Sequence, residues 1–326
     1  MTTPPPPATQ PPLVHLGPAE VASLLTYREA TAAIEAALRE GFDPADDPPR
    51  THVPVRNGQV LLMPSDFGSG TGVKLVAIAP ANDAVGLPRI QGIYLLLDPV
   101  TLTPRALLDG AALTTLRTPA VSMVAVGPAL LRTPEPARVV IFGAGPQGTG
   151  HARALASFLA DRRPIGHLSY VTRRPGAHRG LEPAADQVLA AGSPAVDEAV
   201  AAADVVVCAT TSRTPVLDAA RIRSDAVVVA VGAHEPDARE LDGSLLARAQ
   251  VVVEDVGTSL RECGDVVLAI DEGALTADDL VTIRQVATGQ RTLATDRPVV
   301  FKGSGMSWQD LAVATALVER HRSREA

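Results

Sequence analysis

The sequence predicts an α/β protein with two domains: a parallel sheet covered by helices on both faces, and an α+β domain with a mostly antiparallel sheet. A chain of 326 residues exceeds the roughly 100–200 residues of one typical domain. Hydrophobic residues make up 46% of it but aromatic ones only 3%, so Val, Leu, Ile and Ala must fill a core that suits a doubly covered sheet. After residue 138, short apolar runs alternate with helical stretches in a βαβ rhythm.

The composition excludes several classes of protein. A net charge of -7 without a cluster of Lys and Arg argues against a nucleic-acid partner. The two cysteines, Cys208 and Cys263, have no zinc or disulfide spacing, so we expect no metal and a reducing, cytoplasmic location. No apolar run approaches the roughly 20 residues of a membrane span, and residues 1–12 are expected to be a flexible Pro-rich tail rather than a signal peptide.

The antiparallel part is expected between the tail and residue 130. An amphipathic helix is predicted over residues 18–40, with Gly41 suited to its C-terminal cap. Short strand-like runs separated by turn residues follow it. These runs are residues 51–56, 59–63, 73–78, 90–97 and 105–108.

A helical stretch over residues 111–131 is expected to bridge the two domains. Pro119, Gly127 and Pro128 argue against one unbroken helix here. A last helical run, residues 308–320, is expected to return to the first domain.

A phosphate-binding loop follows the first strand of the parallel sheet. Residues 143–148 read GAGPQG, a complete G-x-G-x-x-G, between a predicted strand at 139–142 and a helical run at 149–159. The first glycine permits a tight turn, the second lets the backbone approach a pyrophosphate, and the third allows close helix–strand packing. This context predicts a Rossmann-type dinucleotide-binding domain. The candidate cofactor-binding residues here and at later strand ends are Gly143, Gly145, Pro146, Gln147, Gly148, Thr172, Arg173, Arg174, Thr210, Thr211 and Val231.

The end of the second strand indicates the choice of nucleotide. Thr172, Arg173 and Arg174 stand where NAD-binding domains usually place an acid for the ribose 2′-hydroxyl. A hydroxyl followed by two guanidinium groups suits a 2′-phosphate, so NADPH is preferred over NADH. The alternative is that both arginines are solvated loop charges.

Three cations are candidates for binding an acidic substrate. Lys74 has apolar neighbours on both sides, and a buried lysine needs a partner or a lowered pKa. Its alternative is an edge-strand lysine that reaches water along its alkyl stem. Arg117 lies in a small, apolar helical stretch, and with Arg50, which alone reads as a surface residue, the three would form a pocket for an α-carboxylate.

Two further side chains are candidates for roles near this pocket. His234 follows a predicted strand end, and its ordinary pKa near neutrality suits proton transfer; a histidine bonded to backbone is the alternative. Asp310 is expected to be structural, either capping the last helix or anchoring a loop.

Several separate motifs make the chain resemble the ornithine cyclodeaminase/mu-crystallin family over nearly its whole length after the tail. They are Gly72-Val73-Lys74, Leu108-Asp109-Gly110 with Leu113-Thr114-Thr115-Leu116-Arg117-Thr118, the loop 143–148, Val231-Gly232-Ala233 with Arg239-Glu240-Leu241, and Phe301-Lys302 with Ser304-Gly305.

The resemblance implies a division of the chain and a set of site residues. Residues 13–130 and 303–326 would form a substrate-binding and dimerisation domain, and residues 131–302 the Rossmann domain of a homodimer. In the matching motifs, Arg50, Lys74 and Arg117 would hold the substrate carboxylate, and Ser304 would join the cofactor site.

One departure from the family pattern favours a reductase. Cyclodeaminases of the family carry an aspartate where this chain has His234, and the surrounding run is similar to that of the ketimine reductase (mu-crystallin) branch. The hypothesis is an NAD(P)H-dependent reduction of a C=N bond next to a carboxylate, with Lys74 and His234 as catalytic groups. The alternatives are an ornithine or lysine cyclodeaminase, an amino-acid dehydrogenase such as alanine dehydrogenase, and a non-catalytic binding protein.

Overall fold

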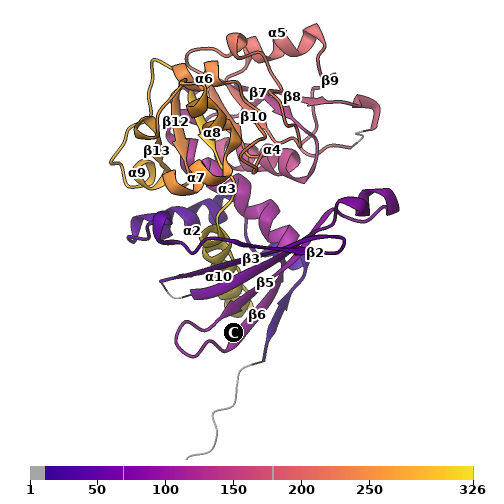
Figure 1. Cartoon of the computed structure of the whole chain (residues 1–326), viewed down its shortest axis with the longest axis vertical. Coiled ribbons are helices and arrows are strands. Elements are labelled where there is room, and N and C mark those ends of the chain that lie inside the picture. The colour runs from indigo at the N-terminus through magenta and orange to yellow at the C-terminus, as the bar shows by residue number, and fades with distance from the viewer. Residues whose placement is uncertain (1–11, 69, 178–179, 326) are drawn as a thin grey trace, which may run out of the picture.

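The computed structural model describes residues 12–68, 70–177 and 180–325, and it contains two sheets, one in the lower and one in the upper half of Figure 1. The tail expected over residues 1–12 lies outside the described residues except for Pro12. No helix of the described chain is long and apolar enough to cross a membrane.

The first sheet is mostly antiparallel, as expected. Its strand order is β1-β6-β5-β4-β3-β2, and only the β1–β6 pair is parallel. Helices α3 and α10 pack on this sheet, so the last helix does return to the first part of the chain. The elements are β1 (Val14–Leu16), α1 (Pro18–Leu24), α2 (Tyr27–Arg39), β2 (Thr51–Val55), β3 (Gly58–Phe67), β4 (Gly70–Ile78), β5 (Ile90–Leu97), β6 (Pro104–Asp109), α3 (Gly110–Leu130) and α10 (Ser307–Glu325).

The prediction of one helix over residues 18–40 was wrong, because two helices occupy this stretch. The chain is extended at Leu25 and Thr26 between α1 and α2. Thr26 accepts a hydrogen bond from the backbone N–H of Glu29, whose carboxylate accepts from the backbone N–H of Thr26 in return. This reciprocal capping box satisfies the donors of a new helix start, so the break is stable.

The prediction that residues 111–131 cannot form one unbroken helix was also wrong. Helix α3 runs from Gly110 to Leu130 with Pro119 and Pro128 inside it, and most of its residues are buried. Pro119 cannot donate to the carbonyl of Thr115. Gly150 of the neighbouring helix packs there, since a Cβ on Gly150 would lie 3.1 Å from the Pro119 ring and 3.2 Å from that carbonyl oxygen. Tertiary packing therefore holds the helix together across its prolines.

The second sheet is parallel throughout, with strand order β13-β12-β14-β11-β10-β7-β8-β9. The chain builds outward from β7 through β8 and β9, then crosses to β10 on the other side, which creates a switch point between β7 and β10. The elements are β7 (Ala137–Phe142), α4 (Pro146–Leu159), β8 (Ile165–Thr172), β9 (Gln187–Ala190), α5 (Pro194–Ala202), β10 (Val205–Cys208), β11 (Val227–Ala230), α6 (Gly243–Arg248), β12 (Gln250–Val253), α7 (Val256–Glu262), α8 (Gly264–Asp271), β13 (Val281–Thr282), α9 (Ile283–Ala287) and β14 (Val299–Lys302). Short 3-10 turns are η1 (Pro44–Asp46), η2 (Pro80–Val85), η3 (Pro175–Ala177), η4 (Ala219–Arg221) and η5 (Ala277–Asp279).

Both faces of the parallel sheet are buried, as the Val-rich composition predicts. Val139 and Ile141 of β7 belong to one hydrophobic core, and Val140 and Phe142 to the other, because successive side chains point to opposite faces. The first core continues without interruption through α3 into the six-stranded sheet. The two sheets are therefore held together by shared apolar packing.

A buried histidine ties α3 to the first turn of α4. His151 is fully buried; its Nδ1–H donates to the carbonyl of Gln147 at 2.8 Å, and Nε2 lies 2.9 Å from the Ser122 hydroxyl. Since a carbonyl can only accept, Nδ1 carries the proton and Nε2 accepts from Ser122. Burial lowers the pKa of His151 to about 4.

We expect His151 to make the fold sensitive to acid. Its pKa is about 6.5 when unfolded and about 4 when folded, so its stabilising effect is present above pH 6.5 and is lost as the pH falls towards 4. Urea unfolding of the wild type and His151→Asn should show the wild type losing roughly 3 kcal/mol more between these pH values. Asp47, whose pKa is raised to about 6 by burial, contributes the opposite trend in both proteins and cancels in the difference. Parallel stability curves for the two proteins would contradict this expectation.

Candidate active site

Three glycines between β7 and α4 have the geometry that a dinucleotide loop requires. Gly143 has a φ of +97°, and a Cβ there would lie 2.5 Å from the carbonyl oxygen of Ala209. A Cβ on Gly148 would lie 1.9 Å from the Gly143 oxygen, so α4 approaches β7 only because this side chain is absent. Gly145 instead faces open space, with no atom within 4 Å of its Cβ position. The loop leaves room for a pyrophosphate at the N-terminus of α4, where backbone N–H groups attract anions.

The other predicted cofactor residues lie at the carboxyl ends of neighbouring strands. Thr172 ends β8, Thr210 and Thr211 follow β10, Val231 follows β11, and Ser304 follows β14. Pro146 and Gln147 form the first turn of α4. Because β14, β11, β10, β7 and β8 are consecutive neighbours, these residues share the edge at which the β7–β10 switch point lies.

The position next to β8 has the polar character expected for a ribose site. The Thr172 side chain is buried, and its hydroxyl has no hydrogen-bond partner within the described residues. Arg173 and Arg174 are exposed beside it. Such a buried hydroxyl, without a partner in the described chain and next to two exposed guanidinium groups, fits a nucleotide ribose.

A buried polar network holds these strand ends in place, and its member Asp265 lies outside the motifs of the sequence. The Glu240 carboxylate accepts from the backbone N–H and hydroxyl of Thr210 at 2.7 and 2.6 Å, and from the Gly232 N–H at 2.7 Å. Asp265 accepts from the backbone N–H groups of Glu240 and Leu241 and pairs with Lys302 at 3.1 Å. Burial raises the pKa of Glu240, and Lys302 opposes this effect. The network connects the loops after β10, β11 and β14.

Lys74, Asp310 and Arg117 form a buried ion cluster. The Asp310 carboxylate lies 2.6 Å from Lys74 Nζ and 3.3 Å from Arg117 Nε. All three side chains are buried, and β4, which carries Lys74, lies between β3 and β5. The edge-strand alternative for Lys74 is therefore wrong. Asp310 also differs from the expected structural cap, because both its carboxylate oxygens are used by the two cations.

The cluster places the pKa of Lys74 near the physiological range. Burial lowers it to about 8, the Asp310 carboxylate opposes that shift, and Arg117 and Arg50 add to it. A lysine with this pKa is protonated at neutral pH and can still release its proton, as acid catalysis requires.

Two polar side chains continue the cluster towards the parallel sheet. Arg117 Nη1 donates to Gln309 Oε1 at 2.7 Å, and Gln309 Nε2 donates to Glu254 at 2.6 Å. Glu254 also accepts from the backbone N–H groups of Ser304 and Gly305. The chain of contacts joins α3 to the end of β12, and the sequence had indicated neither Gln309 nor Glu254.

One residue contacts both the ion cluster and the glycine loop. The Thr114 hydroxyl accepts from Lys74 Nζ at 3.4 Å, and the Thr114 carbonyl accepts from Gln147 Nε2 at 3.4 Å. Gln147 belongs to the predicted cofactor loop, so the ion cluster and the dinucleotide edge adjoin one another across α3.

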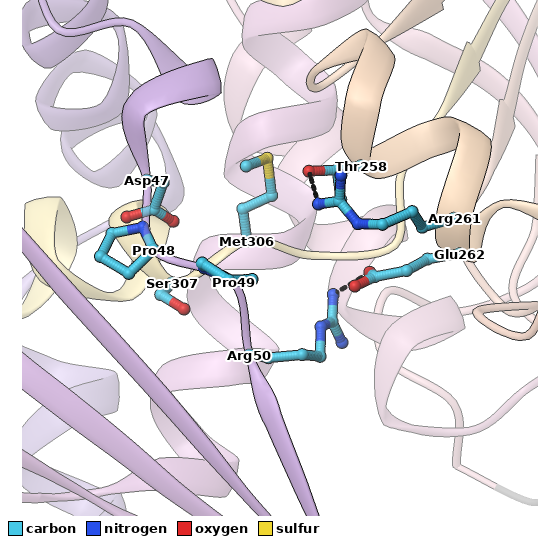
Figure 2. A pocket seen from close by; sticks show the side chains of 9 residues that line it. All are labelled: Asp47, Pro48, Pro49, Arg50, Thr258, Arg261, Glu262, Met306 and Ser307. Atoms are coloured by element: carbon cyan, nitrogen blue, oxygen red, sulfur yellow. Dashed lines mark hydrogen bonds and ion pairs between the residues drawn. The ribbon is translucent and has the colours of Figure 1, made fainter.

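Arg50 lies at the junction of the two sheets, where it lines a small hollow together with Pro49 and Glu262 (Figure 2). Its Nη2 atom donates to the carbonyl of Gly305 at 2.6 Å and pairs with Glu262 of α7 at 2.5 Å. Its side chain is only 9% exposed, which corrects the view of Arg50 as a surface residue. Its charge contributes to the shifts of both Lys74 and His234, so it lies within electrostatic reach of both.

His234 lies in the loop after β11 and keeps solvent access. Its Nδ1 is 3.4 Å from the Gly232 carbonyl, a long contact that orients the ring weakly. Surrounding protein atoms partly desolvate the ring, and together with Arg50 they lower its pKa. The backbone contact expected of a structural histidine and the exposure expected of a reacting one are both present.

The chain is similar to characterised reductases over almost its whole length. Residues 14–325 match the model of the ornithine cyclodeaminase/mu-crystallin family. The chain is 34% identical over 303 residues to Delta(1)-pyrroline-2-carboxylate reductase 2 of Burkholderia ambifaria, which covers 90% of this chain and 91% of that protein. It is 31% identical over 290 residues to ketimine reductase mu-crystallin of Mus musculus, covering 86% and 88% respectively.

A solved structure of another reductase has a similar fold. Delta(1)-pyrroline-2-carboxylate reductase of Thermococcus litoralis, in complex with NADH and L-proline, superposes with a TM-score of 0.85 at 26% identity, over 96% of this chain and 99% of that one. The predicted fold class and the predicted family resemblance are both confirmed. This chain belongs to the ornithine cyclodeaminase/mu-crystallin family.

Proposed function

We propose that this protein reduces the C=N bond of a cyclic ketimine acid, such as pyrroline-2-carboxylate or piperideine-2-carboxylate, with a nicotinamide dinucleotide. The observation that carries the proposal is the buried cluster of Lys74, Asp310 and Arg117 beside the dinucleotide loop. It provides fixed cations for a carboxylate and a titratable amine for a nitrogen. The similarity to pyrroline-2-carboxylate reductases supports the same chemistry.

Arg117 and Arg50 bind the substrate carboxylate in this proposal. A guanidinium group matches a carboxylate through two parallel hydrogen bonds and fixes its orientation. Asp310 and Gln309 hold Arg117 from one side, and Gly305 and Glu262 hold Arg50. Holding the cations in advance reduces the entropy that binding must remove.

Lys74 supplies the proton at the substrate nitrogen, with His234 as a second group able to exchange protons with solvent. An iminium accepts hydride far more readily than a neutral imine, so a protonated amine beside the nitrogen favours the reaction. When bound, NAD(P)H supplies the hydride to the imine carbon. The C=N double bond becomes a C–N single bond, with one hydrogen added to carbon and one to nitrogen.

Absorbance at the nicotinamide band tests this function directly. Purified protein should oxidise NADPH or NADH when a cyclic ketimine acid is added, and Lys74→Ala should abolish turnover while the dinucleotide still binds. In a parallel assay, the protein is incubated with ornithine or lysine and NAD+. Release of ammonia from either without net cofactor change would identify a cyclodeaminase instead, with His234 in place of the family's aspartate.

The alkaline limit of activity should report the Lys74–Asp310 pair. The pKa of Lys74 is lowered to about 8 by burial, so the protonated form is lost above that pH. Removing the carboxylate in Asp310→Asn removes an influence that raises this pKa, so the alkaline limb of kcat/KM should move to lower pH. The matched control is Asp66→Asn, an exposed aspartate that accepts from Thr71. If the alkaline limb of kcat/KM stays at the same pH in Asp310→Asn, Lys74 is not the group that supplies the proton.

Preference for NADPH over NADH is the second part of the proposal. The exposed Arg173 and Arg174 beside the buried Thr172 hydroxyl suit a 2′-phosphate, and no acid stands at the end of β8.

Replacing both arginines with alanine should therefore raise KM for NADPH roughly tenfold or more, because two charge-assisted contacts are lost. KM for NADH should stay within about twofold, since NADH has no phosphate to lose. Steady-state kinetics with both cofactors gives the comparison. The control is Arg162→Ala, in the turn between α4 and β8, where Arg162 stacks on Phe158. An equal rise in KM for both cofactors would show that the arginines do not bind the 2′-phosphate.

An uncovered apolar face supports a homodimer. On the side of the first sheet away from α3 and α10, Leu62, Leu75 and Ile93 are direct cross-strand neighbours and are 38%, 38% and 50% exposed. Val53 and Val55 extend the face on β2, at 41% and 50% exposed. No described element of the chain covers it. A monomer seldom presents such a continuous apolar surface to water, and a second copy of the chain would bury it.

Leu75→Lys should convert the dimer to a monomer. The substitution places a charge at the centre of the apolar face, where dimerisation would have to desolvate it. Light scattering coupled to gel filtration measures the mass, and Val100→Lys, at an exposed residue in the turn after β5, is the control. A wild-type protein that elutes as a monomer would remove the basis for this part of the proposal.

The same proposal assigns the parts of the chain. Residues 13–130 and 303–326 form the substrate and dimerisation domain, and residues 131–302 the Rossmann domain. The ion cluster draws its members from the first of these, and the glycine loop lies in the second. A cytoplasmic location is supported by the two free, buried thiols, Cys208 and Cys263.

A further inference from the structure

Within the described chain, Arg50 is held by two groups that lie far from it in sequence. It precedes β2 of the first sheet, whereas its partners Glu262 and Gly305 belong to α7 and to the loop after β14. Figure 2 shows the guanidinium reaching across the hollow to the Glu262 carboxylate. Its location is therefore set by α7 and by the loop that joins β14 to α10.

A single nitrogen of Arg50 makes both contacts. Nη2 donates to the Gly305 carbonyl at 2.6 Å and forms an ion pair with Glu262 Oε2 at 2.5 Å. Within the described chain, Nη1 and Nε contact no hydrogen-bond acceptor, so their three N–H groups remain available to a ligand.

Glu262 is itself fixed. The same Oε2 atom accepts from the Ser304 hydroxyl at 3.1 Å, and the Glu262 side chain is 18% exposed. Ser304 is held in turn, because its backbone N–H donates to the buried Glu254 at 2.9 Å. A mostly buried charge pair of this kind keeps one geometry better than an exposed pair does.

Gly305 separates Arg50 from Arg117. It has a φ of +81°, its carbonyl accepts from Arg50, and a Cβ on it would lie 2.6 Å from Arg117 Nη1. The two guanidinium groups therefore flank the same glycine, which fixes the gap between them.

We infer that Glu262 is a positioning residue that, with the Gly305 carbonyl, fixes Arg50 for binding the substrate carboxylate. This inference rests on the proposed function in one respect, that Arg50 binds that carboxylate. Glu262 anchors Nη2 and turns Nη1 and Nε towards the ligand. Without it, the Arg50 side chain regains rotamer freedom, and binding must then remove that entropy.

A binding measurement tests the inference without requiring turnover. Isothermal titration of the holoenzyme, saturated with NADPH, with pyrrole-2-carboxylate gives the Kd of a carboxylate probe. Glu262→Gln keeps the shape of the side chain but removes its charge, and Kd should rise roughly tenfold. Glu35→Gln, which removes a surface pair with Arg39, is the matched control and should leave Kd unchanged.

A double-mutant cycle separates positioning from general damage. In an Arg50→Ala background, Glu262→Gln should cause no further loss, because there is no guanidinium left to position. Glu262→Asp keeps the charge on a shorter side chain and should give an intermediate Kd, and it serves as the test variant if Glu262→Gln does not fold. Unchanged or tighter binding by Glu262→Gln, or a loss that persists without Arg50, would overturn the inference.

The ketimine assay on the wild type distinguishes the inference from the proposed function. If the wild type binds the probe in the expected pattern but oxidises no NADPH with ketimine acids, the inference stands and the proposed reduction falls. If the wild type reduces ketimines and Glu262→Gln binds the probe as tightly as the wild type does, the proposed reduction stands and the inference about Glu262 falls. If the wild type binds no carboxylate probe, Arg50 has lost its assigned role and the inference falls with it.

Discussion

The Asp310 carboxylate, shared between Lys74 and Arg117, is the interaction on which the site depends. Each of the three charges comes from a different element, α10, β4 and α3, and each is buried. Removing an ion from water costs several kcal/mol, so any one of them left unpaired would be strongly destabilising. The packing of α10 and α3 on the first sheet is therefore tied to the geometry of the site.

Helix α3 transmits that geometry to the second sheet. It contributes Thr114 and Arg117 to the polar contacts, and its buried apolar residues pack in the core that both sheets share. Pro119 and Pro128 are tolerated because close helix packing surrounds them. The ion cluster and the glycine loop consequently lie on one continuous, closely packed body, which suits a reaction whose rate depends on how well two reactants are held together.

How far the sequence predicted the structure depended on the range of the interaction. The glycine loop and its neighbouring strands were predictable because their signals are local in the chain, as was the unusual setting of Lys74. The capping box of Thr26 and Glu29 has the sequence form S/T-x-x-E, which is a local signal for the start of a new helix at this point.

The partners of the cations could not be predicted in the same way. Asp310 lies 236 residues from Lys74, and Glu262 lies more than two hundred residues from Arg50. Nothing in the local pattern around either acid differs from that of a helix cap or a surface pair. Strand β14 was not predicted either, and its place between β11 and β12 is set by tertiary packing.

The late position of these elements in the chain affects how the protein is made. Strand β14 completes the middle of the parallel sheet, yet it follows every other strand in sequence, and α10, which carries Asp310, follows it. While the chain is being synthesised, β11 and β12 have unpaired edges until β14 emerges. Lys74 and Arg117 likewise lack the Asp310 counterion until α10 emerges. Such long-range closure slows folding and leaves unpaired edges exposed to other chains. Nascent chains stalled before β14 should therefore depend on chaperones to stay out of aggregates, more than a protein whose central strands emerge first.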